Sequence, residues 1–201
     1  MSTRGAAGFR IHGQDKIAYN HYDSYPNGMG LCILEELRQL LITDGIEGVR
    51  EAAANLRVID GETPPTREEQ ERFQEFYRAD IGSRRMDDWH VLLFGTQPSR
   101  GLGPLLKAGI CVDHSTFLAD SLFCEWAYVV NVDEALFEVY RGFGVPGKSV
   151  GRYSTMARAD INYPPVSLVK SVPFDEIKAC KKKKLLALIA DVEDAADDDE
   201  T

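Results

Sequence analysis

The sequence lacks a long hydrophobic run, a secretory start and any closely spaced pair of cysteines. No stretch approaches the roughly 18–20 apolar residues that a membrane span requires, and the first residues contain no apolar core of a signal peptide. The four cysteines are far apart in the chain, which argues against a structural zinc site because such sites draw ligands from close pairs. We therefore expect a soluble, cytoplasmic protein with no membrane partner and no metal.

The sequence also lacks the glycine-rich signatures of nucleotide binding and any excess of basic residues. It contains neither G-x-G-x-x-G nor a Walker loop, so no cofactor is predicted. The formal net charge is −9, but seven of the 32 acidic residues lie in the last eleven positions, which leaves the body nearly neutral. We expect the basic run 181–184 and the adjoining acidic tail to neutralise each other. A neutral body offers no broad electrostatic footprint for DNA or RNA, so no nucleic-acid partner is expected.

What remains is an ordinary globular composition. The chain has 201 residues, of which 44% are apolar and 27% charged, and this suits one domain. We expect residues 1–190 to form a single α+β domain with a helical insertion over about 30–122. A disordered acidic tail is predicted over 191–201. The oligomeric state is left open.

The pattern of apolar residues predicts strands at both ends of the domain. Two apolar and aromatic runs over 5–22, separated by a link that contains Gly and Asp, predict a β-hairpin, and the runs 125–132 and 136–140 give the strongest hairpin signal in the chain. A further strand is predicted within 163–172. Because hairpin strands are antiparallel and are here separated from the helices, the class expected is α+β with an antiparallel sheet.

Helices are predicted between and after these strands. Leucines at three- and four-residue steps over 31–41 indicate an amphipathic helix. Thr66 and Glu69 have the spacing of a capping box, and an apolar face follows from Phe73 to Ile81. A last helix is predicted from Pro173 to about Val192, because a proline and two acidic residues mark its start.

The segment 19–26 has the most distinctive local composition. An amide, an imidazole, a carboxylate and two phenols lie close together in Tyr19-Asn-His-Tyr-Asp-Ser-Tyr25. If the strand persists, His21 and Asp23 share one face, where the carboxylate would orient the imidazole as a general base. The alternative is structural: Asp23 begins a turn and His21 bonds to nearby backbone. Asn20, Tyr19 and Tyr25 are the candidate binding residues beside this pair.

These residues carry a resemblance. The opening Thr3-Arg-Gly5, the segment 19–26 and Gly30 resemble the start of a family of small bacterial and phage proteins with no assigned activity. The hairpin over 125–142 is similar to the C-terminal half of those proteins. The resemblance covers about half of the chain, at its two ends, and implies kinship without a reaction.

A second, looser resemblance concerns layout alone. A short start followed by a β-hairpin resembles the N-terminal-nucleophile hydrolases, in which an exposed Ser, Thr or Cys attacks with its own α-amine as base. Removal of Met1 would expose Ser2, whereas Thr3 would require the loss of two residues. Arg4 is a candidate for recognising a carboxylate or phosphate beside His21.

The remaining histidines admit two interpretations. His90 and His114 would complete a metal site with His21 if the fold brought them together. The sequence Asp87-Asp-Trp-His90 is more typical of a helix start. The leading functional expectation is a hydrolase- or transferase-like site formed by Thr3, Arg4, His21 and Asp23, acting on an unknown small molecule. The alternative is a phage or host accessory protein that binds another protein through aromatic strand surfaces and its acidic tail.

Overall fold

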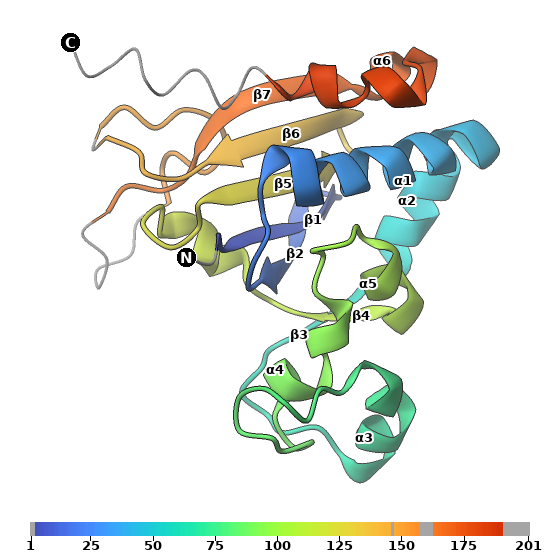
Figure 1. Ribbon diagram of the computed structural model, residues 1–201, viewed down its shortest axis with the longest axis vertical. Coiled ribbons are helices and arrows are strands. Elements are labelled where there is room, and N and C mark those ends of the chain that lie inside the picture. Colours follow the sequence, from blue (N-terminus) through green and yellow to red (C-terminus); the bar gives the residue numbers. More distant parts are fainter. Residues whose placement is uncertain (1–2, 146, 157–162, 191–201) are drawn as a thin grey trace.

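The computed structural model describes residues 3–145, 147–156 and 163–190, and five strands form its main sheet (Figure 1). The order of these strands is β2-β1-β5-β6-β7. Their bounds are β1 (Gly5–Ile11), β2 (Gln14–Asn20), β5 (Trp126–Asn131), β6 (Leu136–Arg141) and β7 (Ser167–Pro173). Two short strands, β3 (Arg57–Ile59) and β4 (Ile110–Val112), form a second, parallel sheet.

The α-helices lie between β2 and β5 and after β7. They are α1 (Leu31–Thr43), α2 (Gly45–Asn55), α3 (Arg67–Phe73), α4 (Trp89–Leu92), α5 (Gly103–Ala108) and α6 (Phe174–Ala179). A π-helical turn, η1 (Pro26–Gly30), leads into α1. Among the described residues no helix is long and apolar enough to cross a membrane.

The main sheet confirms the α+β class, with one departure from the expected pairing. Both predicted hairpins form, as β1–β2 and β5–β6, and β7 adds to β6 in the antiparallel sense. The two hairpins join through β1 and β5, which run parallel. The parallel pair is possible because a long crossover, residues 21–125, returns the chain to the same end of the sheet.

The helices α1, α2 and α6 cover one face of the sheet and form the principal core. Phe9, Tyr128 and Phe137 point from the sheet into this core, where Leu34 and Leu37 of α1 meet them. Lys16 lies at the margin, and its Nζ donates to the carbonyls of Ala53, Ala54 and Leu56 at 2.7–3.0 Å, so it closes the C-terminal end of α2.

The strand register shows what lies on the opposite face. Tyr19 pairs with Ala6 and Ala6 with Ala127, which in turn pairs with Tyr140, so all four lie on one side of the sheet. The chain segments 115–124 and 150–156 pack on this face through Leu118, Cys124 and Tyr153. Gly8 permits the closest strand approach, since a Cβ there would lie 1.9 Å from the Lys16 carbonyl oxygen.

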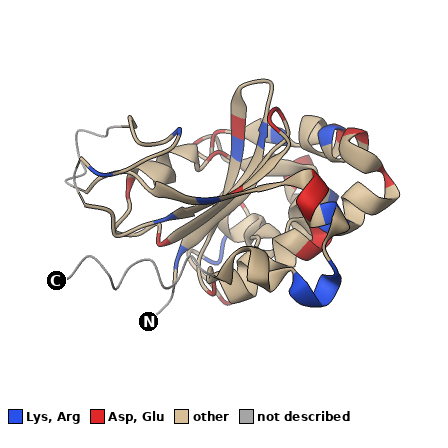
Figure 2. Cartoon of the chain, turned by 90° about the horizontal axis from the view of Figure 1, so that it is seen from above, with Lys and Arg blue, Asp and Glu red and all other residues tan. Residues whose placement is uncertain are grey.

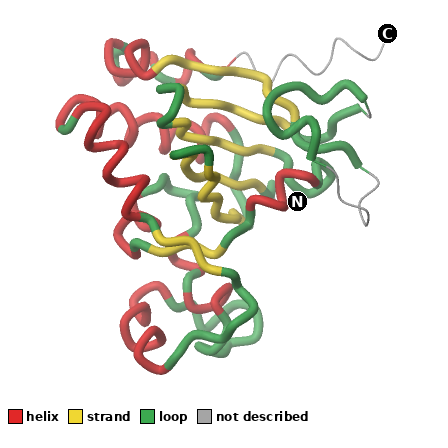
Figure 3. The backbone as a smooth tube through the Cα atoms, turned by 180° about the vertical axis from the view of Figure 1, so that it is seen from behind, coloured by secondary structure: helices red, strands yellow, loops and turns green. Residues whose placement is uncertain are grey.

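A lower lobe, comprising β3, α3, α4, β4 and their connecting loops, projects from the edge of the main sheet (Figures 1 and 3). Phe73, Phe76, Trp89 and Leu92 form its own apolar cluster. The sequence predicts a helical insertion, but this part of the chain also contains β3 and β4. Short strands with only three residues each carry too little alternation to be recognised in the sequence.

The capping box at the start of α3 is confirmed. The Thr66 hydroxyl accepts from the Glu69 backbone, and the Glu69 carboxylate accepts from the Thr66 backbone at 2.9 Å. The predicted extension of the helix to Ile81 is wrong. The chain tightens to a 3₁₀ turn over Gln74–Phe76 and becomes extended at Tyr77.

The last helix is also shorter than predicted. It ends at Ala179, and Cys180 is extended with φ −66° and ψ 139°. The Arg38 guanidinium of α1 donates to the Cys180 carbonyl at 2.6 Å. This side chain supplies the donor that the backbone of a further helical turn would otherwise provide. Lys182 of the basic run pairs with Glu35 of α1 at 3.1 Å. The predicted helix end at Val192 and the acidic tail lie outside the described residues.

Residues of both charge signs are interspersed along the described chain (Figure 2). Their exposed ion pairs are mostly local, such as Arg78 with Asp80 and Arg85 with Asp87. Exposed pairs of this kind contribute little to stability.

Candidate functional site

The loop after β2 is held by a buried brace. The Asn20 side-chain amide donates to the Tyr22 carbonyl at 2.5 Å and to the Ser24 hydroxyl at 2.8 Å, and both Asn20 and Ser24 are fully buried. The Tyr128 hydroxyl donates to the Ser24 carbonyl at 2.9 Å. Asn20 and Ser24 therefore fix the loop rather than bind a ligand, and the cost is a buried Asn20 Oδ1 without a hydrogen bond in the described structure.

The expectation that His21 and Asp23 share a strand face is wrong. Strand β2 ends at Asn20, and Asp23 has φ +60°, a left-handed conformation that aspartate tolerates better than most residues. Strand alternation therefore stops before either side chain is placed. Residues 19–25 instead belong to three separate features: the buried brace, a cluster of histidines and a cleft.

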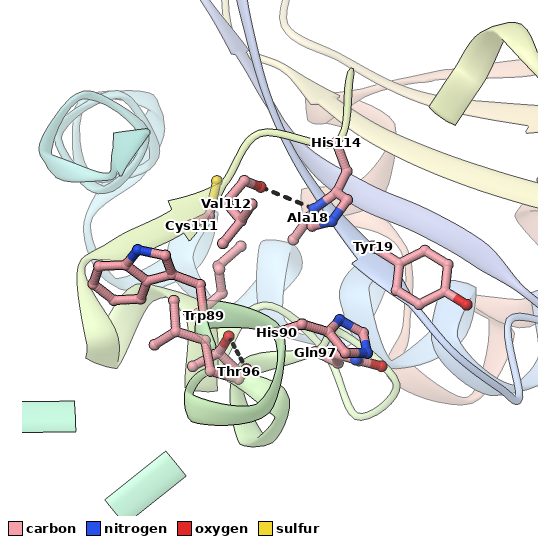
Figure 4. A pocket seen from close by; sticks show the side chains of 11 residues that line it. Ala18, Tyr19, Trp89, His90, Thr96, Gln97, Cys111, Val112 and His114 are labelled. Atoms are coloured by element: carbon pink, nitrogen blue, oxygen red, sulfur yellow. Dashed lines mark hydrogen bonds between the residues drawn. The ribbon is translucent and has the colours of Figure 1, made fainter. Parts of the chain in front are cut away.

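The histidine cluster consists of Tyr19, His21, His90 and His114. Three of the four histidines of the chain surround the Tyr19 ring, with centroid distances of 6.1, 6.0 and 5.8 Å to His21, His90 and His114. The Tyr19 hydroxyl lies 3.0 Å from His21 Nδ1. Figure 4 shows Tyr19 from β2, His90 from α4 and His114 from the segment after β4 around one small hollow.

Local structure explains how each histidine is placed. Asp88 is the N-cap of α4 and accepts from the His90 backbone at 2.9 Å, which confirms the predicted helix start over 87–90. His114 Nδ1 lies 3.0 Å from the Val112 carbonyl. The His21 backbone donates to Gln97 Oε1 at 2.8 Å, so this glutamine ties the loop to the lower lobe.

The surroundings favour the neutral form of His21 and His114. Burial lowers the pKa of His21, and electrostatic interactions with Arg4 and His90 lower it further. Burial also lowers the pKa of His114. Burial raises the pKa of the Tyr19 hydroxyl, against the opposing effect of Arg4. At neutral pH the cluster therefore contains a protonated phenol beside a neutral imidazole, an arrangement suited to proton transfer.

The amino-terminal candidates lie close to this cluster but differ in access. Arg4 acts electrostatically on both Tyr19 and His21, and its guanidinium stacks over Phe123 at 5.3 Å. Thr3 is only 3% exposed, and its carbonyl accepts from the Ser24 backbone at 3.2 Å. The structure thus joins the amino terminus to the loop through Ser24. Ser2 lies outside the described residues.

Asp23 and Tyr25 are not part of the histidine cluster. Asp23 lines a second cavity, the polar cleft, together with Tyr22, Phe94 and Arg100. Tyr25 is 47% exposed, and its carbonyl accepts from Gly28 and Gly30 as the π-helical turn begins. Tyr25 therefore starts a turn, and Pro26 and Asn27 are residue types that favour turns.

The hollow inside the histidine cluster is small. Tyr19, His90 and His114 line it with Gln97 and Cys111, and its cavity volume is about 30 Å³. This space suits a water-sized molecule, because a single water occupies a comparable volume. Burial raises the pKa of Cys111 to about 12, so this thiol stays protonated and is a poor nucleophile. The polar cleft, with a cavity volume of about 280 Å³, has room for a small metabolite.

The cluster does not form a metal site. Among the described residues no group of three or more histidine, cysteine, aspartate or glutamate side chains is placed to hold a metal ion. Phenol and phenyl rings separate the imidazoles instead: Tyr19 lies among all three, and His90 meets Phe94 edge-on at 5.9 Å.

Sequence reasoning missed a second buried polar group, the Glu138 network. Glu138 is 4% exposed and accepts from Asn131 and from the Tyr140 hydroxyl, each at 2.8 Å, and from Arg152. The nearby pair Arg10 and Asp15 is 3.0 Å apart. A glutamate within an apolar strand was the available signal, since a buried carboxylate needs such partners.

Comparison with known proteins identifies no family for the chain. No family model, no curated protein and no solved structure matches the chain. The resemblances drawn from the sequence therefore stay predictions, and the functional argument depends on the site alone.

Proposed function

We propose that the chain is a hydrolase- or transferase-like enzyme in which His21 is the general base. The contact between the Tyr19 hydroxyl and His21 Nδ1 carries this proposal, because it orients a neutral imidazole against Tyr19, which lines the small hollow of the histidine cluster. When Nδ1–H donates to the Tyr19 oxygen, the lone pair lies on Nε2, which is then the proton acceptor.

The neighbours of His21 have complementary roles in this proposal. Arg4 and His90 disfavour the imidazolium and so keep the base unprotonated at neutral pH. Tyr22 and Phe94 contact the His21 ring at centroid distances of 5.6 and 6.4 Å, and both also line the polar cleft. These two aromatic side chains separate His21 from the polar cleft.

A variant test separates this proposal from a structural role. Purified protein would be assayed with p-nitrophenyl acetate, p-nitrophenyl phosphate and amino-acid p-nitroanilides. We expect turnover of at least one probe and a loss of about 100-fold or more in His21→Gln, the usual range for removing a general base. His12→Gln is the matched control, because His12 is exposed in the β1–β2 turn, away from the cluster.

The pH profile supplies a second readout. Because the pKa of His21 lies below its usual range, turnover is expected to rise with pH through that pKa and to be near its maximum at pH 7. Equal rates in the wild type and His21→Gln, or no turnover of any probe by folded protein, would overturn the proposal.

A protein-binding function is the second candidate, and one observation favours it. Phe123, Phe143 and Tyr163 are 47%, 59% and 49% exposed, in loops at the far edge of the sheet face. The Phe143 backbone donates to the Ser121 carbonyl at 2.8 Å, so two of these loops meet. The expected aromatic strand surfaces do not contribute, because Trp126, Tyr128, Phe137 and Tyr140 are buried.

Phe143→Ser tests this candidate against the enzyme. If the loops are a docking surface, this variant loses binding to a partner captured by the wild type, while probe turnover is unchanged. The enzyme proposal expects turnover to be unaffected by Phe143→Ser and abolished by His21→Gln.

A further inference from the structure

The polar cleft has unpaired charges of both signs. Asp23 and Arg100 both line it, and neither forms an ion pair within the described parts of the chain. Arg78 also lines the cleft, but it already binds Asp80 through two hydrogen bonds of 3.0 and 2.9 Å. The cleft therefore offers one available carboxylate and one available guanidinium to a ligand.

Two aromatic rings form the apolar part of the same cleft. Tyr22 and Phe94 are 6.3 Å apart between centroids and tilted by 49°. Tyr22 is 39% exposed, whereas Phe94 is buried at 7%. The exposed part of Tyr22 therefore offers the cleft an aromatic surface for an apolar ligand side chain.

The residues that carry these groups are held rigidly. The Asn20 brace fixes Tyr22 through its carbonyl, and Asp23 follows in a left-handed conformation that sets the direction of its side chain. Opposite them, a Cβ at Gly95 would lie 2.8 Å from the Phe76 carbonyl oxygen, so glycine is needed for the turn that carries Phe94 and Gln97. A preformed arrangement of this kind reduces the entropy lost on binding.

We propose that the polar cleft binds a small zwitterion of the α-amino acid class. The carboxylate would bind Arg100, the ammonium group would bind Asp23, and the side chain would pack on Tyr22. This assignment does not depend on the base proposed at His21, because His21 does not line the cleft. A ligand with both charges matches the cleft better than a simple anion, because an anion would leave Asp23 uncompensated beside it.

Three probes with the same ring distinguish the charges. L-phenylalanine has both charged groups, 3-phenylpropionate has only the carboxylate and phenethylamine has only the ammonium. Binding would be measured by isothermal titration calorimetry on the full chain. We expect phenylalanine to bind most tightly, and the two singly charged probes to bind about tenfold or more weakly, since each loses one charge-assisted contact.

Variants then assign each charge to its residue. Arg100→Gln is expected to weaken the binding of phenylalanine and 3-phenylpropionate and to leave the binding of phenethylamine unchanged. Asp23→Asn is expected to weaken the binding of phenylalanine and phenethylamine and to leave the binding of 3-phenylpropionate unchanged. Arg84→Gln is the matched control, because Arg84 is exposed and does not line the cleft. Tighter binding of 3-phenylpropionate than of phenylalanine, or no binding of any probe at millimolar concentration, would overturn the assignment.

The outcome is separable from that of the catalytic proposal. His21→Gln is expected to bind phenylalanine as the wild type does, because His21 does not line the cleft. Binding without His21-dependent turnover would refute the proposed base and leave the zwitterion site intact. Turnover of p-nitrophenyl probes without phenylalanine binding would refute the zwitterion site alone.

Discussion

Two groups of polar side chains, one buried and one partly exposed, are associated with the same face of the main sheet, and they are built differently. In the Glu138 network one carboxylate accepts from three donors on β5, β6 and the segment after β6. In the histidine cluster four rings meet at centroid distances near 6 Å, and a single side-chain hydrogen bond joins Tyr19 to His21. Hydrogen bonds hold the Glu138 network, whereas three members of the histidine cluster, Tyr19, His90 and His114, line a small cavity.

This difference separates a structural role from a functional one. A buried carboxylate that accepts from three protein donors is committed to those partners, and its removal leaves the partly buried Arg152 without its partner. A neutral imidazole with few hydrogen bonds retains the capacity to take a proton. The comparison predicts opposite responses to substitution: stability depends on Glu138, and activity depends on His21.

The largest effect is expected at the Glu138 network. Glu138→Ala should lower the free energy of unfolding by about 3 kcal/mol, because it leaves the partly buried Arg152 guanidinium uncompensated. His21→Gln should lower it by less than about 1 kcal/mol, as it removes one hydrogen bond. Urea denaturation of both variants measures the contrast, and equal losses would show that the two groups have the same kind of role.

The brace under the loop should rank next. Asn20→Ala removes the hydrogen bonds to the Tyr22 carbonyl and the Ser24 hydroxyl, which together contribute about 2 kcal/mol. Asn55→Ala, at the exposed end of α2, is the matched control and should be nearly neutral. Chemical denaturation that ranks Asn55→Ala equal to Asn20→Ala would contradict a bracing role for Asn20.

A smaller effect is expected in the lower lobe. Thr66→Ala removes the capping box of α3 and should cost about 1 kcal/mol. Because the box is exposed and remote from the sheet, hydrogen exchange should increase in α3 and stay unchanged in β1 and β5. Faster exchange in the main sheet would show that the lobe and the sheet unfold as one unit.

The smallest effect is a pH dependence that arises from His114. Its pKa in the folded state lies below the unfolded value of about 6.5, so the unfolded chain takes up a proton first on acidification. Stability should therefore be full above pH 6.5 and fall as pH drops from 6.5 through the folded pKa. His114→Gln should flatten this part of the urea-denaturation curve against pH, and an unchanged slope would assign the effect to other groups.

The elements predicted from the sequence are those with long, regular patterns. Both hairpins and α1 are confirmed, because apolar and aromatic runs joined by a turn, or leucines over three turns, leave few alternatives. The last helix is shorter than predicted, and the Cys180 carbonyl beyond its end is bound by Arg38, 142 residues away in sequence. The parallel pairing of β1 and β5 was likewise a property of the crossover and not of either strand.

Only part of the candidate site was predictable from the sequence. The segment 19–26 stands out in the sequence by its many polar side chains, and its role as a site stays a prediction. The segment is divided because β2 ends at Asn20 and because Asp23 has a positive φ. The sequence pattern reveals neither feature. His90 and His114 come from the lower lobe and the segment after β4, so only the tertiary fold could place them around Tyr19.

The most direct test of the account is an NMR titration of the His21 imidazole in the wild type, Arg4→Gln and Arg50→Gln. We predict a His21 pKa below its ordinary value of about 6.5, a rise in that pKa in Arg4→Gln and no change in Arg50→Gln, which removes an exposed charge on α2. A His21 pKa at or above 6.5 in the wild type would contradict a neutral base held beside Tyr19 and Arg4.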